Sequence, residues 1–178
     1  MKTSITTMAF CFGLSLASLA GASSAAADGR HVDRDNMKGG RTVGAGRYVA
    51  AENGGVLAQR RVVRSDDQGN VSKTSGGLFR TPNGGQGGRF SNTVHGADGS
   101  VQHQSGLKAS GEKGGVETNG GYQRDANGNL TQNRDTAITN AQTGNTYQGN
   151  TQYSKEAGVS HSATCFDGSG SEIACPSR

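Results

Sequence analysis

One short turn motif decides the fold of this chain. It reads Asp66-Asp67-Gln68-Gly69-Asn70-Val71, and it returns as Ala97-Asp98-Gly99-Ser100-Val101 and as Asp125-Ala126-Asn127-Gly128-Asn129-Leu130. Each copy places a glycine before a small polar residue and then an aliphatic one. Gly and Asn tolerate a positive backbone φ, and Asp accepts hydrogen bonds from its own turn, so each copy predicts a tight turn beside a β-strand.

The glycines of this motif follow a fixed period. Gly39 is followed by glycines at intervals of 15 up to Gly114, and the series continues at Gly128, Gly144 and Gly158. Self-similarity at a fixed spacing is typical of tandem repeats. The turn positions that we predict are Gly54, Gly69, Gly84, Gly99, Gly114, Gly128 and Gly144.

A second column of residues shares the period. Two positions after the repeat glycine the chain often carries an aliphatic residue, which we expect to be the repeat core. These residues are Val56, Val71, Val101, Val116 and Leu130.

The repeats predict an all-β fold. Each unit of about 15 residues reads as strand-turn-strand, with two short strands such as 71–74 and 77–80. Past the first 27 residues no apolar rhythm of 3.6 residues appears, and the glycine density is too high for helices. Two architectures fit, a narrow β-solenoid or an antiparallel array of hairpins, either of them partly flexible.

The domain organisation follows from composition. Residues 1–27 have a basic start, an apolar run and the sequence Ala25-Ala26-Ala27, which together indicate a secretory signal peptide, helical in the precursor. A short membrane anchor is the alternative. We expect a flexible lead-in over 28–38, repeats over 39–157 and a terminal cap over 158–178. The exported chain would be periplasmic, cell-surface or extracellular, without a membrane span.

Two cysteines, Cys165 and Cys175, remain after the signal segment. They flank an Asp-Gly-Ser-Gly turn and would meet an oxidising compartment, so we predict a disulfide that pins a hairpin. Metal ligation and redox chemistry are the alternatives; the spacing does not fit a close-set zinc site, and the sequence after the signal segment has no second cysteine pair.

Composition argues against an enzyme. The 178 residues include 30 glycines, and only 31% of the chain is hydrophobic, which is too little for a broad closed core. No catalytic triad, metal cluster, phosphate loop or dinucleotide motif appears, and we expect no cofactor. His95 and His103 flank one turn but are offset by two positions from a facing pair.

The basic residues outnumber the acidic ones slightly, and the formal net charge is +4. The excess lies in the first half of the exported chain, so a polyanion is a possible ligand. The candidate contacts are Arg60, Arg61, Arg64, Arg80 and Arg89. Alternation along a strand would divide Arg60, Arg61 and Arg64 between two faces. Seven aromatic residues, with Arg47, Arg80, Arg89 and Arg124 nearby, either form a stacking surface or fill a thin core.

One segment resembles a known repeat. The stretch Tyr122-Gln123-Arg124-Asp125-Ala126-Asn127-Gly128-Asn129-Leu130-Thr131 resembles the turn of YD-repeat proteins, which are large secreted bacterial β-shells, although the adjacent Tyr-Asp pair is missing. As a whole the chain is similar to small exported Gly/Asn-rich repeat proteins of Gram-negative bacteria. Neither resemblance assigns a functional residue.

The sequence therefore predicts an exported structural or adhesive repeat protein of the cell surface or extracellular matrix that can self-assemble. The alternative is a secreted binding module for polysaccharide or another polyanion. An ice-binding protein or an enzyme fits less well, and nucleic acid is not the partner that we expect.

Overall fold

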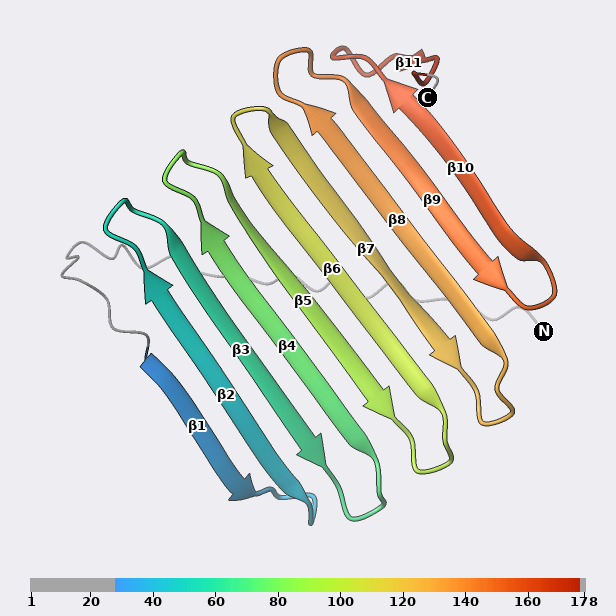
Figure 1. Ribbon diagram of the computed structural model, residues 1–178. Helices are drawn as coiled ribbons and strands as arrows, with labels where there is room; N and C mark the ends of the chain where they lie inside the picture. Colours follow the sequence, from blue (N-terminus) through green and yellow to red (C-terminus); the bar gives the residue numbers. More distant parts are fainter. Residues whose placement is uncertain (1–27, 177–178) are drawn as a thin grey trace.

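The computed structural model describes residues 28–176, and these residues form one open antiparallel sheet of 11 strands (Figure 1). The strands lie side by side in chain order, from β1 to β11. The predicted signal segment lies outside the described residues. The bounds are β1 Asp28–Asp35, β2 Arg41–Ala50, β3 Val56–Ser65, β4 Val71–Arg80, β5 Gln86–His95, β6 Val101–Gly111, β7 Gly114–Arg124, β8 Leu130–Asn140, β9 Thr146–Ser154, β10 Gly158–Phe166 and β11 Glu172–Ile173.

Each unit of 15 residues holds one long strand and one turn, so the prediction of two short strands per unit was wrong. Strand β4, for example, runs without a break through Ser75-Gly76-Gly77, which resembles a turn in the sequence. Gly76 and Gly77 stay extended because they pair with Phe90 and Arg89 on β5 in an unbroken ladder.

The solenoid alternative was also wrong. Every neighbouring pair of strands is antiparallel, so the chain reverses direction at each turn instead of coiling in one sense. The hairpin array is the architecture that forms. Within residues 28–176, strands contact only the strands next to them in the sequence.

The turns contain six of the seven predicted glycines in a left-handed conformation, and the seventh, Gly114, is the first residue of β7 with φ of +144°. All seven have positive φ, with +84° at Gly69 and at Gly99. In the β3–β4 turn, the amide of Gly69 donates to the carbonyl of Asp66, and the amide of Asp66 donates to the carbonyl of Asn70. A left-handed glycine that closes such a turn is a common hairpin connection.

Both ends of the expected repeat region differ from the expectation. The proposed flexible lead-in contributes β1, which pairs with β2 over eight residue pairs. The proposed terminal cap contributes β10, a full strand of the sheet, and only β11 forms the short final hairpin. Both terminal segments form strands because their backbones pair with the neighbouring strand, β2 or β9. Their local composition does not reveal this pairing.

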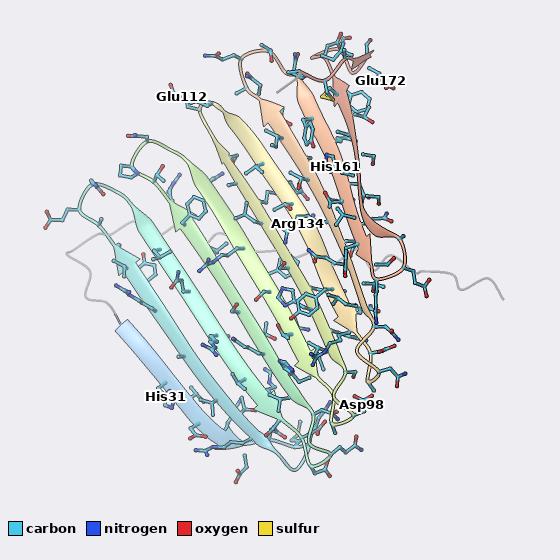
Figure 2. All side chains as sticks on the ribbon, turned by 45° about the vertical axis from the view of Figure 1, so that its right-hand side comes forward. His31, Asp98, Glu112, Arg134, His161 and Glu172 are labelled. Atoms are coloured by element: carbon cyan, nitrogen blue, oxygen red, sulfur yellow. A yellow bond between two sulfur atoms is a disulfide. The ribbon has the colours of Figure 1, made fainter. Side chains whose placement is uncertain are left out.

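Successive side chains point to opposite faces of this single layer (Figure 2). We call the face that carries the side chain of Arg61 face A. The opposite face, which carries the side chain of Arg60, is face B. Directly paired residues share a face, so the register of the strand pairs assigns every strand residue to one of the two. Because both faces are open, few side chains are buried; Cys165 is 4% and Val101 6% exposed.

The main apolar cluster is a row across face A near one end of the strands. We call this set the apolar row, and each member pairs directly with the next. It consists of Val49, Leu57, Phe79, Gly87, Ala109, Val116, Ile138, Tyr147, Cys165 and Ile173.

The predicted repeat core does not form one ladder. Val71, Val101 and Leu130 lie on face A at the end of the strands opposite the apolar row, Val116 belongs to that row, and Val56 lies on face B. Consecutive strands run in opposite directions, so each strand begins at the other end of the sheet, which separates Val116 from Val71, Val101 and Leu130. The short β6–β7 connection shifts the pairing by one residue, so Val116 lies on the face opposite to that of Val56.

Several strand glycines lie under large side chains. A Cβ on Gly87 would stand 2.6 Å from Cζ of Phe79, and one on Gly88 would stand 2.8 Å from Cδ2 of Leu78. Phe90 covers Gly106 in the same way. These pairs bury apolar surface in a layer that has no second sheet to pack against. Within the described residues, no helix has the length and apolar character needed to cross a membrane.

Candidate binding faces and sheet edge

The centre of face A is a row of small hydroxyl side chains between two arginines. Arg61, Ser75, Ser91, Ser105, Gly120 and Arg134 pair in sequence from β3 to β8, and we call them the serine row. The hydroxyls of Ser75 and Ser91 are 2.9 Å apart. Arg134 donates from Nη1 to the hydroxyl of Thr118 at 3.3 Å, and Figure 2 labels it near the middle of its strand.

On strands β2–β10 the charges of face A have one sign, whereas β1 adds Asp33 and Asp35 to this face. From β2 to β10 this face carries seven exposed basic residues and no acidic residue. They are Arg41, Arg47, Arg61, Lys73, Arg89, Arg124 and Arg134. Arg41 forms an ion pair with Asp33 of β1, and the hydrogen bond between them lowers the pKa of Asp33 and raises that of Arg41. Within residues 28–176 the other six make no ion pair.

Three of these cations form a diagonal line. Arg47 lies opposite Gln59, two residues from Arg61; Arg61 lies opposite Ser75, two residues from Lys73. The next diagonal position, on β5, is His95. Diagonal neighbours of this kind are about 7–8 Å apart between Cα atoms. The line therefore crosses four strands with a regular spacing of side chains.

The five arginines predicted to contact a polyanion do not gather in one place. Arg61 and Arg89 lie on face A, whereas Arg60, Arg64 and Arg80 lie on face B. Lys73 and Arg134 were not among the contacts predicted from the sequence. The signal that could have identified them is the alternation of side chains between the two faces along a strand. It groups these cations only when each unit is one strand of ten residues instead of two short strands.

Face B is mixed in charge and holds an open hollow of about 360 Å³ over β7–β10. Glu117 and Asp135 line it. Lys108 donates to Glu117 at 2.9 Å and lowers the pKa of that carboxyl, and Asn150 donates to Asp135 at 2.6 Å. Both carboxylates are thus engaged with neighbouring strands, and the hollow is open to solvent.

The aromatic residues do not form one stacking surface. Phe79, Tyr122, Tyr147 and Tyr153 lie on face A, and Tyr48, Phe90 and Phe166 lie on face B. Tyr122 is stacked on His103 with ring centroids 5.0 Å apart. His103 pairs with Thr93 and His95 pairs with Val101, which is the expected offset of two positions.

The turn aspartates are hydrogen-bond acceptors. Asp125 accepts from the amide of Asn129 at 2.8 Å and from its side chain at 2.7 Å, and these bonds lower the pKa of Asp125. Asp66 is held in the same way by Asn70. Asp98 and Asp167 also have lowered pKa values because nearby serine side chains donate to them. These carboxylates stabilise turns by closing Asx-type hydrogen bonds.

The two cysteines form the predicted disulfide, with Cα atoms 5.2 Å apart. Cys165 pairs with Ile173 in the β10–β11 ladder, so Cys175 joins it from just beyond that hairpin. The disulfide holds β11 against one end of β10. Strand β11 covers only Cys165 and Phe166, and the remainder of β10, from Gly158 to Thr164, is an open edge of the described sheet.

Within the described part of the chain, no three His, Cys, Asp or Glu side chains gather in a way that could hold a metal ion. The arrangement offers exposed cations, hydroxyls and one open strand edge, which are groups for binding. Comparisons with family models, with curated proteins and with solved structures gave no match.

Proposed function

We propose that this is an exported structural or adhesive protein of the cell surface or extracellular matrix, and that it assembles by pairing sheet edges. The observation that supports self-assembly most strongly is the open edge of β10. Export rests on the signal-like sequence of residues 1–27.

The β10 edge has none of the usual features that prevent strand addition. Its open part reads Gly-Val-Ser-His-Ser-Ala-Thr over residues 158–164, with no Lys, Arg, Asp, Glu or Pro. The side chain of Val159 is 71% exposed. An open strand edge of this length presents backbone donors and acceptors to any other strand.

The opposite edge of the sheet differs in character. Strand β1 carries Asp33, Arg34 and Asp35 in succession, and charges of this kind discourage strand addition. Pairing between the β10 edges of two copies would join the two uncharged edges and leave the charged ones outside. Such pairing is two-fold symmetric and closes at a dimer, whereas β10-to-β1 pairing would continue as a fibre. We therefore infer a dimer as the first assembled species.

The test places charges on the edge. In the chain purified from the exported fraction, Ser160→Lys with Ser162→Lys adds two cations to the exposed side of β10 on face B. The matched control, Gln102→Lys with Gln104→Lys, adds the same charge to the same face of the interior strand β6. Sedimentation should show a dimer for the parent and the control and a monomer for the β10 variant.

Two results would contradict the proposal. A parent chain that stays monomeric at high concentration removes the assembly, and equal dimerisation of both variants removes the β10 edge as its site. Immunogold labelling of intact cells tests the location separately: the surface should be labelled, and labelling confined to the cytoplasm would refute export.

A further inference from the structure

We propose that face A binds an acidic polysaccharide along the diagonal formed by Arg47, Arg61 and Lys73. The strand register separates the cations of face A from the acidic residues, and this separation is independent of assembly at the β10 edge.

The separation has a simple structural origin. Eight acidic residues lie in turns, at the ends of the strands and away from the centre of either face: Glu52, Asp66, Asp67, Asp98, Glu112, Asp125, Glu156 and Asp167. Figure 2 labels Asp98 and Glu112 at opposite ends of the sheet. On strands β2–β10 the two acidic residues, Glu117 and Asp135, both point to face B. Face A is therefore left with cations alone over nine strands.

The cations of the diagonal are available to a ligand. Arg47, Arg61 and Lys73 are exposed, and none makes an ion pair within residues 28–176. An anionic chain lying across the strands would meet one cation on each of three consecutive strands, at spacings of about 7–8 Å. A surface of one sign attracts such a chain over a distance set by the ionic strength.

The groups beside the diagonal favour a sugar chain over a single-stranded nucleic acid. Arg61 is followed across the sheet by the hydroxyls of Ser75, Ser91 and Ser105, which suit the hydroxyls of a saccharide. Nucleic acid of this form is bound largely by stacking bases on free aromatic rings. On face A the ring of Tyr122 is already stacked on His103, Phe79 covers Gly87 and Tyr147 covers Gly149. Tyr153 lies on β9, five strands away from Lys73 on β4. Phe90, which is 50% exposed, lies on face B.

The test compares two triple variants that remove equal charge. The first, Arg47→Gln with Arg61→Gln and Lys73→Gln, neutralises the diagonal on strands β2–β4. The second, Arg60→Gln with Arg64→Gln and Arg80→Gln, neutralises three arginines of face B on β3 and β4. Circular dichroism checks that both fold. Binding to polygalacturonate, heparin, neutral dextran and oligo-dT is then measured by calorimetry over a series of salt concentrations, on the full exported chain.

The expected result is binding to polygalacturonate or heparin that weakens roughly tenfold in the face A variant, since each exposed charge pair contributes a factor of about two. The slope of log K against log salt should decrease by about 2. The face B variant should bind like the parent. Preference between the carboxylate and the sulfate polymer identifies the anionic group.

Three outcomes would overturn the proposal. Equal weakening of both variants would mean that net charge alone drives binding. Binding to neutral dextran as strong as to the acidic polymers, or no binding to any of them, would remove the charge recognition. Tighter binding to oligo-dT than to either acidic polysaccharide would assign the face to nucleic acid.

Discussion

Replacement of the turn glycine Gly99 by alanine should destabilise the chain through its backbone conformation alone. Gly99 has φ of +84°, and a Cβ placed on it would have no atom within 4 Å. Steric clash with neighbours is therefore absent, and the cost is that of holding an L-residue in the left-handed region, about 1–2 kcal/mol. The unfolded chain loses conformational freedom on replacement of Gly by Ala, which offsets about 0.4–1 kcal/mol.

The net expectation is a loss of about 1 kcal/mol in the free energy of unfolding, or a decrease of about 2–4 °C in the midpoint temperature for a chain of this size. Gly76→Ala is the matched control. Gly76 lies in an extended strand, and a Cβ there would meet its nearest atom, the carbonyl oxygen of Arg89, at an ordinary 3.6 Å. This substitution should leave stability unchanged or raise it slightly.

Urea titration of the three chains, followed by circular dichroism, measures both effects. A third variant, Gly99→Asn, should recover part of the loss, because Asn tolerates the left-handed region better than Ala does. The reasoning would be refuted if Gly99→Ala were as mild as Gly76→Ala, or if Asn were no better than Ala at position 99.

Three further predictions concern the strands, the turns and the disulfide. Gly106→Ala should cost about 1–3 kcal/mol because its Cβ would overlap the ring of Phe90 and stand 2.5 Å from Oδ1 of Asn119. Adding Phe90→Leu should recover part of that loss in urea titrations, and equal stability of the single and double variants would contradict it. Hydrogen bonds hold the pKa of Asp125 below its ordinary value of 3.8, so this carboxylate stabilises the fold above about pH 4 and the contribution is lost as the pH falls; thermal midpoints of Asp125→Asn should decrease less on acidification than those of the parent. Cys165→Ser with Cys175→Ser should lower the free energy of unfolding by about 3 kcal/mol, as expected for a closed loop of about 11 residues. The double variant should also self-associate more strongly because the last two positions of the β10 edge become free, and unchanged sedimentation would refute this second part.

The turns could be predicted from the sequence because their chemistry is local. A left-handed glycine and an acceptor such as Asp66 or Asp125 are required by the turn itself, wherever the chain goes next. The class of the fold and the disulfide partners could be predicted for the same reason. The length of the strands could not, since Ser75-Gly76-Gly77 has the composition of a turn and is held extended only by pairing with β5.

The wrong prediction of strand length is also the reason why the cations of face A could not be grouped from the sequence. With two short strands per unit, Arg60, Arg61 and Arg64 form a basic cluster that alternation divides, but no other cation can be assigned to a face. With one strand of ten residues, parity and register place Arg47, Arg61 and Lys73 on the same face. The strands β1 and β10 were missed because pairing to a sheet edge is a non-local interaction that their composition does not show.

The open, single-layer sheet in chain order is the central claim, and one distance tests it directly. Arg60 on β3 and Ser162 on β10 lie in the same row of face B, seven strand spacings apart. At about 4.8 Å for each spacing, their Cα atoms should be about 34 Å apart, or somewhat less with twist. Cysteines are introduced at these two positions and carry spin labels, and the native disulfide is kept oxidised. Pulsed electron paramagnetic resonance on this chain, diluted with unlabelled protein, then measures the distance between the labels. A distribution centred near 30–35 Å is the predicted result, and one centred below about 20 Å would show a closed or stacked arrangement and contradict the open sheet.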